Sequence, residues 1–246
     1  MYKLITTIMK NPSISTIIII ICLLIIGLYA MGEVNYFASK VAAEKNYTSP
    51  VIVIPNIGIE EKINNHSLNQ GVLSEPAGNV PIQNSIILYG HRTLQGSPFL
   101  RLNDVSMGDS LVLEWPGVGE VKYTVINKKV VPANYQLQPS GNNIYLITCD
   151  PIGSTENRLI LEGQFQGQGP VNEAILQNNP QETNALMITA LFLIVRLIFS
   201  FFYPKDNRIY ILATVLIISA ILFYCCINPF PSELIYEKIL FLNGGM

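Results

Sequence analysis

Three long apolar runs constrain most strongly what this chain can fold into. They cover Ile14 to Met31, Ala185 to Tyr203 and Ile209 to Ile227. Each is close to the roughly 20 apolar residues that a helix needs to cross the hydrocarbon core of a bilayer. The sequence therefore predicts one membrane span before a more polar middle segment and two spans after it.

The first run could instead be a cleaved signal peptide, because Lys3 and Lys10 precede it as a positively charged n-region would. The run is longer than the roughly 7 to 15 residues of a usual signal-peptide core, and no clear small-x-small cleavage site follows it. We therefore expect an uncleaved membrane anchor.

Positively charged residues predict the orientation of the spans. Lys3 and Lys10 flank the first span, and Lys205 and Arg208 lie in the short connection between the second and third. The positive-inside rule places both groups in the cytoplasm. The N-terminus is then cytoplasmic, and residues 32–184 lie outside the cytoplasmic membrane, as does the tail after the third span.

The overall charge excludes one class of partner. Charged residues make up 13% of the chain and the formal net charge is -2, against about 25% charged residues in a typical soluble domain. No basic patch is present that would attract phosphates. We therefore expect a lipid bilayer, and no nucleic acid, among the partners.

Cysteine usage singles out Cys149. Cys22, Cys225 and Cys226 all lie in the predicted spans, so Cys149 is the one cysteine of the extracytoplasmic segment. It has no partner there for an intramolecular disulfide. A lone thiol in an oxidising compartment is a liability unless it is buried or used, which favours a functional role.

The sequence pattern of the middle segment is typical of short β-strands. We expect about seven or eight strands and few helices, which favours a closed all-β barrel or a sandwich. A strand with a bulge, or at a sheet edge, is expected around Pro55, and a strand buried on both faces at 85–89. Ser97 to Val105 resembles a short helix, and Gly163 to Thr183 a linker. The other expected strands are 111–115, 121–126 either extended or followed by 128–131, 144–148 and one beginning at 158.

Cys149 ends one of these strands just before a turn, where a side chain is rigidly held but accessible. A catalytic cysteine needs a nearby base or cation to supply thiolate. The chain has two histidines. His91 directly follows the buried-looking strand 85–89, whereas His66 lies in a polar loop, so His91 is the favoured base.

Arg158 opens the strand after the Cys149 loop. Consecutive strands joined by a short loop are usually neighbours, so Arg158 and Cys149 should face the same end of the sheet. The guanidinium could stabilise an oxyanion in acyl transfer, or it could pair with Asp150 or Glu156.

The sequence lacks the residue patterns that zinc coordination or a phosphate-binding loop would need, so no metal or cofactor is expected.

An ordered series of motifs resembles the sortases, membrane-anchored cysteine transpeptidases. The resemblance covers about Val51 to Gln166 and rests on the stretches IVIPNIGIEEKI, SIILYGHRT, SPFLRLNDVSMGDSLVL, YLITCDP and NRLIL. It implies a sortase-like eight-stranded β-barrel with short helices.

The resemblance also implies roles for the residues singled out above. Cys149 would attack the backbone carbonyl of an LPxTG-like sorting signal near the C-terminus of a secreted protein and form a thioester. His91 would be its acid and base, Arg158 would stabilise the oxyanion or hold the substrate backbone, and Thr148 would add a hydroxyl that contacts the substrate. The acceptor would be an amine of the cell wall or of a pilin subunit.

Spans after the catalytic domain resemble pilin-polymerising class C sortases, but Gly32 to Pro50 lacks the Asp-Pro-aromatic lid motif of that class. Anchoring and pilus assembly therefore both stay open, as do a hydrolase of the same fold and a non-catalytic binding module. The expected organisation is an anchor (1–31), a stalk (32–50), the catalytic barrel (51–166), a linker (167–184), two spans (185–227) and an extracytoplasmic tail (228–246).

Overall fold

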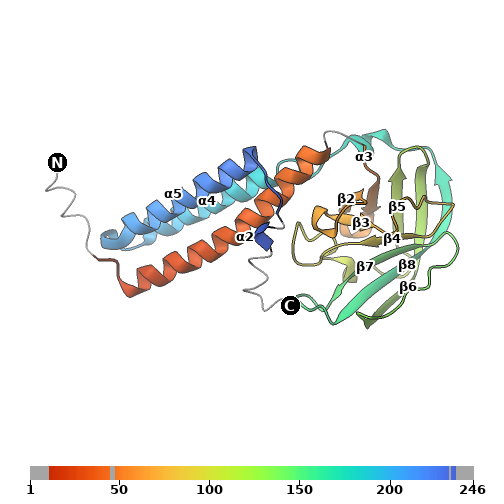
Figure 1. The fold of residues 1–246 in the computed structure, drawn as a ribbon, viewed down its shortest axis with the longest axis horizontal. Coiled ribbons are helices and arrows are strands. Elements are labelled where there is room, and N and C mark those ends of the chain that lie inside the picture. The colour runs from red at the N-terminus through yellow and green to blue at the C-terminus, as the bar shows by residue number, and fades with distance from the viewer. Residues whose placement is uncertain (1–10, 45–47, 233, 237–246) are drawn as a thin grey trace. The chain divides into compact units, whose positions relative to one another are not determined.

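The computed structural model describes residues 11–44, 48–232 and 234–236. The chain divides into two compact units, a barrel unit of Lys40–Pro180 and a helical unit of Met1–Ser39 with Gln181–Met246 (Figure 1). Lys3 and Lys10, which support the predicted orientation, lie outside the described residues, as does the end of the predicted tail, 237–246.

Eight strands close into a barrel, which confirms the predicted fold class. Their order around the barrel is β1-β2-β3-β4-β7-β8-β6-β5, with the pairs β2–β3 and β4–β7 parallel and the other neighbours antiparallel. The strands are β1 (Val51–Ile54), β2 (Ile59–Asn64), β3 (Val72–Ser74), β4 (Ile86–Tyr89), β5 (Ser110–Trp115), β6 (Gly119–Pro132), β7 (Ile144–Asp150) and β8 (Asn157–Gly169).

These pairings give the barrel two distinct ends. β1, β4, β6 and β7 run in one direction, and β2, β3, β5 and β8 run in the other. The ends of β4 and β7 therefore meet the start of β8 at one opening, the β7 mouth. The start of β1 meets the ends of β2, β3 and β5 at the other, the β1 mouth.

The region around Pro55 differs from the prediction. A 3-10 turn (Pro55–Ile57) and Gly58, at φ 66°, reverse the chain, so β1 and β2 form an antiparallel hairpin with Ile54 opposite Ile59. The prediction of one bulged or edge strand was therefore wrong. Proline fixes φ near the value that a tight turn needs, and glycine adopts the left-handed conformation without strain.

The predicted linker begins too early. β8 continues to Gly169 and stays paired with β6, so Gly163 to Gly169 is strand. The glycines that suggested a linker serve packing instead. A Cβ at Gly163 would lie 2.7 Å from a methyl group of Ile144, closer than nonbonded carbon atoms approach.

Other short elements were only partly anticipated. β3, three residues long, was not expected at all. The predicted helix at 97–105 is reduced to a 3-10 turn, Leu102–Asp104, although its apolar positions do pack into the barrel. In β4 only alternate residues are fully buried, not both faces as expected. The central core is apolar and comes from nearly every strand; its largest fully buried side chains include Tyr123, Phe99, Ile52, Ile86, Leu113 and Leu146.

The helical unit contains α2 (Ile14–Glu44), α4 (Asn184–Phe202) and α5 (Lys205–Ile227). These three helices are long and apolar enough to cross a membrane, which confirms that part of the prediction. α2 does not end with the apolar run. It continues through most of the expected stalk, where Asn35 donates to the Met31 carbonyl and accepts from the Phe230 amide. A short helix, α3 (Glu173–Gln177), precedes α4 in the barrel unit.

Phe99 supplies a direct test of the barrel core. Its side chain is fully buried, and truncating a buried phenylalanine costs about 3–5 kcal/mol. We expect Phe99→Ala to lower the free energy of unfolding by that amount in urea titrations followed by the fluorescence of Trp115, the only tryptophan. Met107→Ala is the control, because that side chain is 69% exposed. Equal losses in the two variants would contradict this core.

Candidate active site

Cys149 and Arg158 lie side by side at the β7 mouth. The register of β7 and β8 pairs the two residues directly. Directly opposed residues of an antiparallel pair point to the same face, with Cβ atoms about 4.5–5.5 Å apart. The neighbouring residues Thr148 and Leu159 are almost fully buried and face inward, so Cys149 and Arg158 both face outward from the barrel.

The parallel pairing of β4 with β7 brings His91 to the same place. Tyr89 is the register partner of Ile147, and the Gly90 amide donates to the Ile147 carbonyl at 3.1 Å. β4 ends at Tyr89, but the Gly90 bond continues its pairing with β7. Two residues beyond the Tyr89–Ile147 pair come His91 and Cys149, and side-chain alternation along this extension would place His91 on the same outer face as Tyr89. The three residues singled out in the sequence thus come from three adjacent strands or their ends.

Thr148 holds the histidine segment against β7. Its side chain is 3% exposed, and its hydroxyl donates to the Gly90 carbonyl at 2.8 Å. The Gly90 backbone is therefore bonded on both its amide and its carbonyl to β7. The Thr148 proton is used inside the scaffold, which favours a positioning role over the substrate contact that we expected.

Arg92 makes a further connection that the sequence reasoning missed. Its side chain is 5% exposed, and Nη1 donates to the Cys149 carbonyl at 3.1 Å and forms an ion pair with Asp150. Arg92, the residue after His91, is thus hydrogen-bonded to the backbone of Cys149. The only sequence signal for this contact was the position of Arg92 beside a candidate histidine, because the contact spans 57 residues.

His91 is held in a largely dehydrated environment. Its carbonyl accepts from the Phe99 amide at 3.1 Å, and its Nε2 is buried without a hydrogen-bond partner among the described residues. Burial disfavours the charged imidazolium and lowers the pKa of His91 below its usual 6.5. The preceding Gly90 is required for packing, because a Cβ there would lie 2.5 Å from the Phe99 ring.

Arg158 keeps donors available at the site. Its Nη1 donates to the Thr155 carbonyl at 2.9 Å and to the Asn157 carbonyl at 3.0 Å. In the described part of the chain its Nε and Nη2 have no hydrogen-bond partner and it forms no ion pair, whereas Asp150 pairs with Arg92. The alternative prediction, an ion pair between Arg158 and Asp150 or Glu156, is therefore wrong for this structure.

An apolar strip and a groove lie on the same outer face. Tyr145, Ile147 and Ile160 form a small buried cluster with flanking apolar residues of β4, β6 and the β6–β7 connection. Beside it, Ile87 and Tyr89 line a groove of about 490 Å³. Burial and the nearby charge of Glu75 raise the pKa of Tyr89, so this hydroxyl stays protonated and can donate.

His66 does not join the group around Cys149. It is an exposed residue of the β2–β3 connection, and its amide donates to Asn64 Oδ1 at 3.0 Å. It lies at the edge of the groove that Tyr89 lines. Among residues 11–44, 48–232 and 234–236, no cluster of three or more histidine, cysteine or carboxylate side chains could hold a metal ion.

Residues 47–166 match the family model described as Sortase domain. The barrel domain of this chain therefore belongs to the sortase family, and its function is of the sortase type in general terms. No curated protein sequence matches the chain.

Several solved structures are similar to the chain. Sortase A from Corynebacterium diphtheriae is 24% identical over 52% of this chain and 65% of that protein, with a TM-score of 0.45. Listeria monocytogenes sortase A is 19% identical over 52% and 93%, with a TM-score of 0.45. Clostridium perfringens sortase C with the C-terminal cell wall sorting motif is 25% identical over 48% and 69%, with a TM-score of 0.43.

The lowered pKa of His91 predicts a pH dependence of stability. Between pH 6.5 and the lower folded-state pKa, the unfolded chain binds more protons than the folded chain. The contribution of neutral His91 is therefore fully present above pH 6.5 and is lost as the pH falls toward the folded-state pKa. We expect His91→Gln to lose less stability than the unsubstituted chain between about pH 7.5 and 5.5, measured by urea titration with Trp115 fluorescence. Equal losses would contradict the prediction.

The contacts of Arg92 with Cys149 and Asp150 predict that the segment around His91 is rigidly held. Arg92→Met removes the bond to the Cys149 carbonyl and leaves Asp150 unpaired, which should cost about 1–3 kcal/mol. Hydrogen exchange at the Gly90 amide should speed up correspondingly. Arg92→Lys should be intermediate, because lysine keeps the charge but not the planar fork. Lys122→Met removes a surface ion pair with Glu120 and should leave the Gly90 amide unchanged. If the Gly90 amide exchanged at the same rate in Arg92→Met as in Lys122→Met, Arg92 would not hold this segment in place.

Proposed function

We propose that this chain is a membrane-anchored cysteine transpeptidase that cleaves LPxTG-like sorting signals of secreted proteins and transfers the acyl group to an amine. The observation that supports the proposal is the register of β4, β7 and β8, which pairs Cys149 with Arg158 and brings the end of β4, followed by His91, alongside β7. A nucleophile, a base and a fixed donor are the groups that acyl transfer requires.

In the first step the Cys149 sulfur attacks the carbonyl carbon of the scissile peptide bond. The C–S bond forms, and His91 receives the thiol proton. His91 then protonates the leaving amine as the C–N bond breaks, which leaves a thioester on Cys149. The lowered pKa of His91 favours the neutral imidazole before reaction, so the ring is ready to accept that proton and holds it weakly afterwards.

In the second step an incoming amine attacks the thioester. His91 removes a proton from the amine, the new C–N bond forms and the C–S bond breaks. His91 then returns the proton to the departing sulfur, which restores the Cys149 thiol and the neutral imidazole. Arg158 stabilises the negative oxygen in both tetrahedral intermediates through donors that the protein leaves unused. Removing one such donor typically costs about 100- to 1,000-fold in kcat.

The substrate would lie along the outer face. Ile87 and Tyr89, which line the groove on this face, offer apolar contact for the leucine and proline of an LPxTG-like signal. One similar solved structure, the Clostridium perfringens sortase C, contains a C-terminal cell wall sorting motif. Thr148 and Arg92 would position the catalytic pair without touching the substrate.

Three candidate spans support membrane anchoring. Lys205 and Arg208 in the α4–α5 connection favour a cytoplasmic position for that connection, which places the barrel outside together with secreted substrates. The acceptor would be a cell-wall amine in protein anchoring or a lysine of a pilin in polymerisation. If water replaced the amine, the same site would act as a hydrolase.

The test incubates the full chain in detergent micelles with a panel of sorting-signal peptides and a free amine. We expect a thioester on Cys149 by intact mass and an amide product. Cys149→Ala should form neither, and Arg158→Met should lose about 100- to 1,000-fold in kcat.

The two histidines provide the control for this test. His91→Gln should lose about 100- to 10,000-fold in kcat, whereas His66→Gln should retain catalysis. The ratio of ligated to hydrolysed peptide separates the transpeptidase from the hydrolase. Absence of a thioester with every peptide of the panel, or equal losses in the two histidine variants, would contradict the proposed function.

A further inference from the structure

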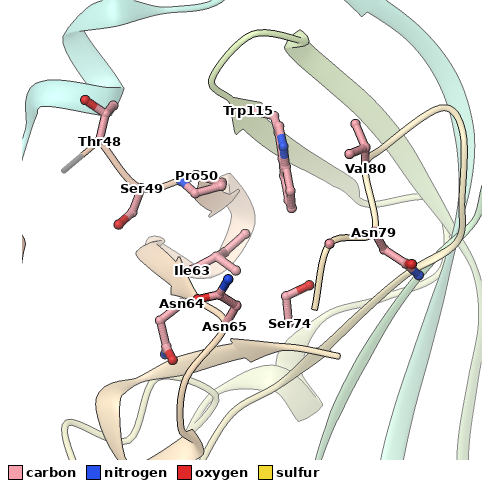
Figure 2. Close-up of a pocket in the computed structure, with 11 residues that line it drawn as sticks. Thr48, Ser49, Pro50, Ile63, Asn64, Asn65, Ser74, Asn79, Val80 and Trp115 are labelled. Carbon is pink, nitrogen blue, oxygen red and sulfur yellow. The ribbon is translucent and has the colours of Figure 1, made fainter. Parts of the chain in front are cut away.

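We propose that the β1 mouth of the barrel is a binding site for a neutral saccharide, at the opposite end from Cys149. A cavity of about 310 Å³ opens at this mouth, a volume at the lower end of the roughly 300–1,000 Å³ of small-molecule sites. Its walls come from the segment before β1, the ends of β2, β3 and β5, and the β3–β4 connection (Figure 2).

The described lining offers no counter-ion to a charged ligand. None of the 11 described residues that line the cavity carries a charge. A phosphate, a carboxylate or an ammonium group would lose water there without gaining a counter-ion, which is costly. The chemistry of the cavity therefore fits a neutral ligand that has both apolar surface and hydrogen-bonding groups.

Trp115 provides the apolar surface. Its ring projects into the cavity and leaves a flat side accessible across from Pro50 and Ile63 (Figure 2). The ring also packs against the barrel core, so its orientation is fixed. An indole face is the broadest flat apolar surface that a side chain offers, and its negative π face attracts the weakly positive C–H groups of a sugar ring.

Polar groups with unused hydrogen-bonding capacity surround this ring. In the described part of the chain, the Trp115 Nε1, the Ser74 hydroxyl and the Asn79 Oδ1 have no hydrogen-bond partner. Ser74 is only 6% exposed. One donor, one acceptor and one hydroxyl that can act as either match the hydroxyl groups of a saccharide, each of which both donates and accepts.

The cavity is formed before any ligand arrives. Asn64 Nδ2 donates to the Val72 carbonyl at 2.9 Å, and its Oδ1 accepts from the amides of His66 and Ser67. Asn79 Nδ2 donates to the Ser85 carbonyl at 2.9 Å. These bonds fix the walls, so a ligand would bind without having to order the loops.

The experiment titrates the full chain with cellobiose and with N,N′-diacetylchitobiose and follows the emission of Trp115, the only tryptophan. The micelles must be formed by a detergent without a sugar headgroup, because such a headgroup would compete. We expect a saturable change with at least one of these neutral disaccharides and none with glucuronate. No change with either disaccharide up to its solubility limit, or an equal change with glucuronate, would overturn the proposal.

Variants distinguish saccharide binding in this cavity from nonspecific binding elsewhere on the protein. Ser74→Ala keeps the fluorophore and should weaken binding about two- to tenfold, the effect of one lost hydrogen bond. Ser106→Ala, at an exposed serine elsewhere on the barrel, should bind like the unsubstituted chain. By saturation-transfer NMR of the sugar, Trp115→Phe should weaken binding and Trp115→Ala should abolish it.

If Trp115→Ala does not fold, Ser74→Ala and Trp115→Phe still carry the test. Unchanged affinity in both would overturn the assignment. The titration uses no sorting peptide and no catalytic residue. Ser74 also lines the groove beside Tyr89, whereas Trp115 lines only the cavity, so Trp115→Phe is the variant that separates this proposal from the proposed acyl transfer.

Discussion

The parallel pairing of β4 with β7 is the constraint on which the site depends. Parallel neighbours bring the same ends of two strands together, and here those ends carry His91 and Cys149. Three bonds tie the β4 end to β7: the Gly90 amide to the Ile147 carbonyl, the Thr148 hydroxyl to the Gly90 carbonyl, and Arg92 to the Cys149 carbonyl. Without this pairing, residues 58 positions apart would have no reason to share a face.

The barrel separates its two ends by chemistry as well as by position. The β7 mouth gathers a thiol, an imidazole and a guanidinium, with an apolar strip alongside. The β1 mouth has a cavity lined without charge and with the only tryptophan. The strand pattern also brings the chain into the barrel at β1 and out of it after β8 at this same β1 mouth. The proposed catalytic site at the β7 mouth therefore lies at the other end of the barrel from the start of β1 and the end of β8.

Much of this arrangement could be predicted from the sequence, for identifiable reasons. Cys149 and Arg158 flank a short loop, so hairpin geometry was enough to predict that they are neighbours. The three candidate spans were predictable because each is a long, almost uninterrupted apolar run. The barrel itself came from counting short strands and from the family resemblance. His91 was suggested by its position at a strand end, although only the β4–β7 pairing places it beside Cys149.

The features that were missed depend on tertiary contacts. Arg92 looked like any loop arginine until its partners at Cys149 and Asp150 were known. β3 is too short for a periodic pattern, and the Gly-Gln sequence of β8 resembled a linker because its pairing partner, β6, lies far away in the chain. The Pro55 turn was read as an irregularity in one strand, since proline marks a break but not the direction in which the chain continues.

The central claim is that His91 and Cys149 act as a pair, and the alkylation rate of Cys149 as a function of pH tests it most directly. The rate would be followed by mass spectrometry of the Cys149 peptide in the intact chain, in His91→Gln and in His66→Gln. The unsubstituted chain and His66→Gln should show, besides the ionisation of the thiol, a step below pH 6.5 that reports the titration of His91. His91→Gln should lack that step. Superimposable profiles for His91→Gln and the unsubstituted chain would contradict the pairing.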